Sequence, residues 1–249
     1  MNIKDVNRIG IEVPPNVWEA IFIKQLRLME KYEPIEKRNG AIVPDHVGNA
    51  VMVMPDGSKI NFPCFAIDDA KTQMRLKDMF WRATEEFAEA LENTTINMSN
   101  MRGLDESTPN EVAHVYEELI DALHFLVEAS IIGGLHPAAG PDVFNLMSEF
   151  SLVQAEHADT PLPPIVSRDI SLYVWPIIRS LGLAANTLKN KPWKQSQMLT
   201  DRRLFLHWLK EAWTQFMRLV LEVNLTEADV FILYTQKNEV NKFRQRSNY

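Results

Sequence analysis

Apolar residues recur three and four positions apart over most of the chain, which is the pattern of amphipathic helices. In one such stretch, Leu76, Phe80, Ala83 and Phe87 fall on a single helix face. The stretches with this spacing are 16–32, 70–92, 109–134, 167–190, 200–222 and 226–245, with a shorter one near 143–153. The hydrophobic pattern therefore predicts an all-α protein.

Capping residues and prolines mark where these helices begin and end. Side chains that can accept a hydrogen bond from the first turn predict N-caps at Asn16, Thr108, Thr200 and Thr226. The signal at Thr108 is strong, because Pro109 and Glu111 follow it as in a capping box. Pro34 should end the first helix near Tyr32, and Pro176 should kink the helix over 167–190.

Two regions between the helices have a different character. Gly and Pro punctuate residues 38–66, where Pro55-Asp56-Gly57 separates the runs VMVM and KINF and predicts a small β-hairpin. The segments HPAAGP and TPLPP lie within residues 135–166, which we interpret as a connector.

The two halves of the chain resemble each other weakly. Leu119 aligns with Leu209 and Ala122 with Ala212, an offset of 90 residues in both cases. The second copy lacks the acidic residues of the first, since Glu118 is matched by Trp208. We therefore predict two helical hairpins packed as a four-helix core, one functional and one structural.

Composition narrows the classes of protein. The 249 residues carry a net charge of −7, which argues against a protein that binds duplex nucleic acid through a basic face. No apolar run is long enough for a membrane span, and the N-terminus has no apolar core of a signal peptide. The single cysteine, Cys64, cannot form an internal disulfide. These features predict a cytoplasmic protein without a membrane partner.

Two carboxylate pairs are the main candidates for chemistry. Glu86 and Glu89 lie three residues apart at the edge of one apolar face, and Glu118 and Asp121 repeat that spacing on the next helix. Carboxylates with no His or Cys favour Mg²⁺ or Mn²⁺ over zinc or copper, and Mg²⁺ indicates a polyphosphate substrate. The competing interpretation is two solvated or salt-bridged faces. Asp121 and His124 also have the spacing of a di-iron ligand pair, but no second pair occurs, so we favour packing or pocket lining for His124.

Two further groups of polar residues are candidates for ligand binding. Lys237, Asn241 and Arg244 share one face of the last helix, with Asn238 beside them. They either complement the helix dipole or form a phosphate clamp. Gln25 sits within the apolar stripe of the first helix, either as a flanking polar residue or as an amide facing a pocket.

Three motifs, EFAEALE, EELIDALHFL and YTQKNEVNKFRQRSNY, together resemble the all-α dimeric dUTPases and the related dCTPase-dUTPase of T-even phages. These are MazG-like nucleoside triphosphate pyrophosphatases. The resemblance implies a MazG-like helical bundle in one domain over 1–249. Its catalytic half would span about 16–134, its connector 135–166, and its degenerate half with the phosphate-binding helix 167–249. It also implies a homodimer, and host cytoplasm for a phage-encoded protein.

The resemblance implies a role for each candidate residue. Glu86, Glu89, Glu118 and Asp121 match the metal ligands, with Glu86 or Glu89 also positioning or deprotonating water. Lys237, Asn241 and Arg244 match the phosphate-binding residues; Gln25, His124, Phe125 and Asn238 match the base and sugar pocket. The expected reaction is Mg²⁺-dependent hydrolysis of a deoxynucleoside triphosphate to the monophosphate and pyrophosphate.

The resemblance does not decide which base the protein prefers. The Asn that usually follows the pocket glutamine by three residues is replaced, since the sequence reads Gln25-Leu26-Arg27-Leu28-Met29. The expected Trp-Lys motif occurs only at Trp193-Lys194, and Asn248 replaces a glycine. We expect dUTP first and dCTP next, with another deoxynucleotide of a modified-base pathway as an alternative. A catalytically silent nucleotide-binding or phage–host interaction protein is the alternative from another class.

Overall fold

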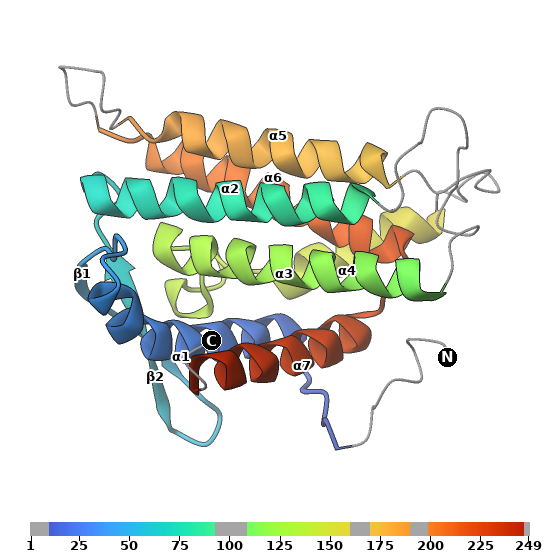
Figure 1. The fold of residues 1–249 in the computed structure, drawn as a ribbon, viewed down its shortest axis with the longest axis horizontal. Helices are drawn as coiled ribbons and strands as arrows, with labels where there is room; N and C mark the ends of the chain where they lie inside the picture. Colours follow the sequence, from blue (N-terminus) through green and yellow to red (C-terminus); the bar gives the residue numbers. More distant parts are fainter. Residues whose placement is uncertain (1–9, 93–108, 160–169, 190–198, 247–249) are drawn as a thin grey trace.

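The computed structural model describes residues 10–92, 109–159, 170–189 and 199–246 and has the predicted all-α class (Figure 1). A two-stranded antiparallel hairpin accompanies the helices in these ranges. The elements are α1 (Val17–Arg38), β1 (His46–Val53), β2 (Lys59–Phe65), α2 (Ala70–Glu92), α3 (Pro109–Gly133), η3 (Pro137–Ala139), α4 (Leu146–Asp159), α5 (Ser171–Thr187), α6 (Arg202–Glu222) and α7 (Glu227–Arg246).

Two helical hairpins form the centre of the molecule, as the repeat predicts. Helix α2 packs along α3, α5 packs along α6, and α2 also contacts α5. In Figure 1, α5 lies above α2, α6 passes behind α2, and α1 and α7 lie below α3. Helices α1 and α7 pack against each other and against α3. Helix α3 is therefore covered from several sides.

An aromatic cluster joins four of the helices. Trp18 of α1 lies 5.8 Å from Trp213 of α6 in an edge-on arrangement and 5.6 Å from Phe150 of α4, measured between ring centroids. Trp213 also donates a hydrogen bond from Nε1 to the hydroxyl of Ser130 on α3, at 2.8 Å. Because Phe150 is fully buried, α4 belongs to the hydrophobic core and does more than connect the two hairpins.

The long apolar helix is a core element. The stretch Val112–Ala139 is long and apolar enough to span a membrane by length and composition, with a mean hydropathy of 1.3 over its best window. However, 83% of that window is buried inside the protein. Its hydrophobicity is therefore explained by packing against the surrounding helices.

The predicted hairpin is confirmed, and it packs against the helical body. Gly57 turns the chain with a φ of 81°, and the Asp56 carboxylate accepts a hydrogen bond from the backbone of Ser58. Phe62 is buried and stacks on His136, with ring centroids 4.9 Å apart. Strand β2 also contacts α3, which places the hairpin at one end of that helix.

Three helix boundaries differ from the sequence-based expectation. Helix α1 continues through Pro34 to Arg38. Proline has no N–H to donate to the carbonyl of Glu30, but both residues are exposed, so that carbonyl faces solvent. Helix α6 is capped by Asp201, which accepts from the Leu204 backbone. Thr200 instead donates its backbone N–H to Asp68. Helix α4 covers Leu146–Asp159 and not 143–153, and Thr108 lies outside the described residues.

The close approach of α3 and α6 allows a test of the packing. A methyl group added at Gly133 would lie 2.8 Å from a ring carbon of the fully buried Phe205. We expect Gly133→Ala to lower the free energy of unfolding by about 1–3 kcal/mol in denaturant titrations. Gly182→Ala is the control, because its methyl group meets no atom within 4 Å in the middle of α5. That variant should be neutral or gain up to about 1 kcal/mol; equal losses in both variants would contradict the packing.

Candidate functional site

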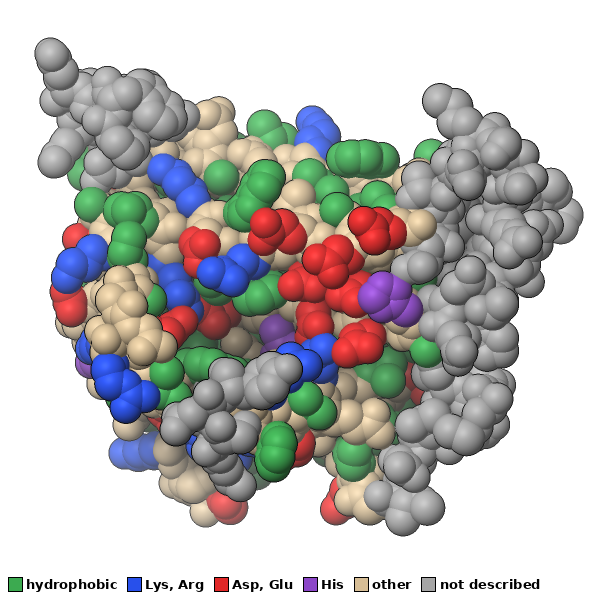
Figure 2. All heavy atoms as spheres, in the orientation of Figure 1, with side chains coloured by type: hydrophobic (Ala, Val, Ile, Leu, Met, Phe, Trp, Pro, Cys, Tyr) green, Lys and Arg blue, Asp and Glu red, His purple; other side chains and the backbone are tan. Residues whose placement is uncertain are grey.

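Three of the predicted metal ligands lie together where α2 faces α3. Single carboxylate oxygens of Glu86, Glu89 and Glu118 all lie within 4.8 Å of one another. The packing of α2 along α3 produces this arrangement, because residues three apart share a helix face. Figure 2 shows acidic side chains gathered over these two helices, with basic side chains at the edge of the acidic patch. Glu89 is exposed, as are Glu85 and Glu92 on the same helix, whereas Glu86 is half-buried and Glu118 is buried.

The electrostatics of this cluster favour a bound cation. Burial raises the pKa of Glu86 to about 8, and a hydrogen bond to Glu118 and the charges of Asp121, Glu118 and Glu89 add to the shift. His114 lies at the outer edge, with Nδ1 3.0 Å from Glu118 Oε1. Carboxylates this close repel each other when ionised, and a divalent cation relieves that repulsion. The oxygen-only donor set suits Mg²⁺ or Mn²⁺.

Asp121 lies next to the cluster, but its carboxylate forms an ion pair with Lys237. Its Oδ2 is 2.6 Å from Lys237 Nζ, and the same ammonium group lies 2.7 Å from Glu117 Oε1. Burial raises the pKa of Asp121, and Lys237 acts against that shift. Burial alone would lower the pKa of Lys237, but its hydrogen bonds to Asp121 and Glu117 raise it. The lysine is therefore a fixed cation between the carboxylates and α7.

A cavity of about 440 Å³ extends from these carboxylates toward the β-hairpin. Most of the residues predicted for the site line it: Gln25, Glu86, Asp121, His124, Phe125, Lys237, Asn241 and Arg244. The hairpin region adds His46, Pro63 and Phe65 at the other end, a contribution that the sequence does not suggest. The cavity thus has both polar and apolar side chains in its wall, as ligand pockets commonly do.

Three predicted residues do not line the cavity. Glu89 and Glu118 belong to the acidic cluster beside it. Asn238 is fully buried in α7, and neither atom of its amide group has a hydrogen-bond partner among the described residues. Buried amides are almost always hydrogen-bonded, so this side chain needs a partner that the described residues do not provide.

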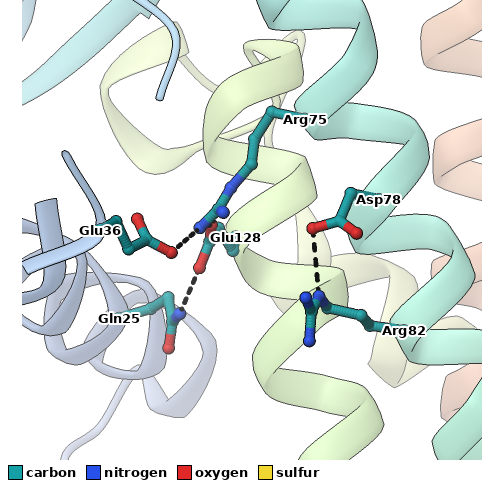
Figure 3. A network of polar contacts seen from close by, with 6 residues as sticks. All are labelled: Gln25, Glu36, Arg75, Asp78, Arg82 and Glu128. Atoms are coloured by element: carbon teal, nitrogen blue, oxygen red, sulfur yellow. Dashed lines mark hydrogen bonds and ion pairs between the residues drawn. The ribbon is translucent and has the colours of Figure 1, made fainter. Parts of the chain in front are cut away.

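A network of buried polar side chains includes several residues of the cavity wall, and the sequence gives little sign of it. Tyr234 donates from its hydroxyl to Gln25 Oε1 at 2.6 Å, and Gln25 Nε2 donates to Glu128 Oε2 at 3.3 Å. Arg75 donates to the other oxygen of Glu128 and to Glu36 (Figure 3). The one visible signal is Glu128 itself, a carboxylate within the apolar run LHFLVEASII.

The fold and the site together indicate the class of protein. An all-α protein whose facing helices hold carboxylates beside a cavity with lysine and arginine is suited to a metal and a polyanion. A family model described as dUTPase matches residues 104–249, more than half of the chain. The protein therefore belongs to this dUTPase family, whose members are hydrolases of a nucleotide substrate. No curated protein and no solved structure matches the chain.

The raised pKa of Glu86 predicts how the metal-free protein responds to pH. The unfolded chain ionises this carboxyl near its ordinary pKa of 4.5, whereas the folded protein keeps its proton until about pH 8. Between these values the folded state binds more protons, so stability falls as pH rises. We expect the Tm in a chelator to fall across this window, and the fall to be smaller in Glu86→Gln.

Glu85→Gln is the matched control, because Glu85 is the exposed neighbour on the same helix. It should follow the wild type. A fall of the same size in Glu86→Gln and in the control would contradict the assignment of this titration to Glu86.

Proposed function

We propose that the protein hydrolyses a deoxynucleoside triphosphate to the monophosphate and pyrophosphate with Mg²⁺, with dUTP as the first substrate and dCTP as the next. The observation that carries this proposal is the cluster of Glu86, Glu89 and Glu118 at one end of a cavity whose wall also presents Lys237 and Arg244. Family membership supports the coarse reaction. The choice between bases and the identity of the metal are our inferences.

The metal would be held by Glu86, Glu89, Glu118 and Asp121. When bound, Mg²⁺ supplies charge that neutralises the phosphates and lowers the pKa of a water molecule. If Asp121 joins the ligands, the metal would weaken its ion pair with Lys237, because two cations would then share one carboxylate. A polyphosphate offers Lys237 a new acceptor, so ligand binding would compensate for that loss.

The side chains of the protein would perform the remaining steps. Glu86 or Glu89 would position an attacking water or accept its proton. Lys237, Asn241 and Arg244 all line the cavity from α7 and would stabilise the charge of the departing pyrophosphate. Gln25, His124 and Phe125 would hold the base, and Asn238 would lie beside the sugar or base.

We further propose that the single domain acts as a homodimer in the cytoplasm. Trp81 of α2 and Leu172 and Trp175 of α5 are at least 60% exposed, which is unusual for such large apolar side chains. The helices that carry them pack against each other. An apolar surface of this kind is typical of a face covered by a second copy of the chain.

A panel of deoxynucleoside triphosphates tests the reaction and the base together. We expect pyrophosphate release with Mg²⁺, fastest for dUTP, and none in a chelator. Release of inorganic phosphate alone would contradict the proposed bond cleavage. Calorimetric binding of a nucleotide without turnover would favour the catalytically silent alternative.

Variants of the carboxylates test the metal site. Glu89→Ala and Asp121→Ala should lower kcat by about 100-fold or more, because each removes a ligand from the charged centre. Both should keep the helical circular dichroism of the wild type. Glu92→Ala is the control, since Glu92 lies exposed on the same helix. Wild-type turnover in Asp121→Ala would exclude that residue from the site.

A further inference from the structure

The Gln25 side chain is held by hydrogen bonds on both sides of its amide group. Its carbonyl oxygen accepts from the Tyr234 hydroxyl at 2.6 Å and lies 3.0 Å from His124 Nδ1. Its nitrogen donates to Glu128 Oε2 at 3.3 Å. Gln25 is only 3% exposed, and an amide buried among such partners cannot rotate without breaking these bonds.

The direction of this amide follows from the ion pair behind it. Arg75 reaches from α2 to Glu128 on α3, with Nε at 3.0 Å and Nη2 at 2.6 Å from the same carboxylate oxygen. Burial raises the pKa of Glu128, and the charge and hydrogen bonds of Arg75 act against that shift. The guanidinium only donates, so the carboxylate oxygens of Glu128 accept from it. The second oxygen of Glu128 therefore attracts the NH₂ side of Gln25. Figure 3 shows Glu128 between Arg75 and the Gln25 amide.

The Gln25 amide in turn sets the tautomer of His124. Because a carbonyl oxygen faces His124 Nδ1, that nitrogen must carry the proton, and Nε2 is left with a lone pair. Burial lowers the pKa of His124 to about 3, so the ring is neutral at physiological pH. Nε2 has no hydrogen-bond partner among the described residues. The ring stacks on Tyr234, with centroids 4.0 Å apart, which fixes its plane.

We propose that Arg75 and Glu128 are positioning residues that act through Gln25 to leave His124 Nε2, a buried atom of a ring that lines the cavity, as a hydrogen-bond acceptor, and that this polarity selects uracil over cytosine. The choice of base rests on the proposed function; the polarity of the network does not.

Uracil and cytosine differ at N3, the atom that would face an acceptor such as His124 Nε2. Uracil carries a proton on N3 between two carbonyl oxygens, whereas cytosine has a lone pair on N3 and an amino group at C4. Opposite His124 Nε2, the N3–H of uracil makes a hydrogen bond, but the N3 of cytosine places two lone pairs together. The second N–H of Gln25 can donate to a carbonyl oxygen of uracil, and both residues line the cavity. A buried mismatch of this kind discriminates strongly, because both groups lose their partners.

Nitrogen NMR of the ligand-free protein tests the polarity without any activity. The protein has six histidines, so His124→Gln identifies the relevant signal. We expect a neutral ring in the wild type with the proton on Nδ1 and a pyridine-like Nε2. A proton on Nε2 would overturn the proposal, whatever the enzyme hydrolyses.

Glu128→Gln tests the origin of the polarity. A glutamine can present either an oxygen or an NH₂ group, so Gln25 is free to turn over and the His124 proton can move to Nε2. We expect a second tautomer in the NMR signal and a fall of about tenfold or more in the ratio of kcat/KM for dUTP to that for dCTP. Arg75 keeps Glu36 as a partner, at 2.7 Å, so its charge is not left alone. Arg75→Lys, which keeps the cation, should retain most of the wild-type ratio.

Glu156→Gln is the matched control, since it removes a carboxylate from an exposed Glu–Arg ion pair with Arg218. It should change neither readout. Equal losses with dUTP and dCTP in Glu128→Gln, together with an unchanged tautomer, would show a merely structural role and overturn the proposal. Absence of hydrolysis in the wild type would instead refute the proposed function, while the tautomer would still decide the polarity.

Discussion

The mutual repulsion of carboxylates held between α2 and α3 is the constraint on which the site depends. Helix packing brings Glu86, Glu89 and Glu118 within 4.8 Å of one another, and the pKa of Glu86 rises to about 8 as a result of burial and these neighbours. Such a cluster destabilises the folded chain when it is empty and ionised. A cation that binds only the folded arrangement would therefore raise the free energy of unfolding.

Two groups of ion pairs lie near the carboxylate cluster, and they differ in their exposure to solvent. Arg75 with Glu128 and Glu36 is nearly closed to solvent and has its hydrogen bonds satisfied, so it fixes geometry. Lys237 with Asp121 and Glu117 is more open, since Glu117 is 56% exposed, and a phosphate can compete for the ammonium group. One cavity thus combines a rigid polar wall with an ion pair that a phosphate can exchange.

The sequence predicted those features that depend on local spacing. Helical periodicity located the helices, and the three-residue spacing of Glu86 and Glu89 placed them on one flank. The predictions from Pro34 and Thr200 were wrong, because they rested on local rules. Pro34 is exposed and lies within the helix, and the backbone N–H of Thr200 donates to Asp68, which is far away in the sequence. The partners of Gln25 and Arg75 were equally invisible, since Arg75 and Glu128 are 53 residues apart and meet only when α2 packs on α3.

The two hairpins share their apolar core positions and differ at the acidic ones. Leu209, Ala212 and Trp213 of α6 align with Leu119, Ala122 and Leu123 of α3, and all six are at most 1% exposed. Trp208 and Glu211, which align with Glu118 and Asp121, are only half-buried. Trp213 bonds to Ser130 of α3 and packs on Trp18 of α1. Apolar burial on this side of α3 supplies the free energy that the carboxylate side lacks. The acidic cluster therefore lies on a flank of α3 whose opposite side packs on the apolar face of α6.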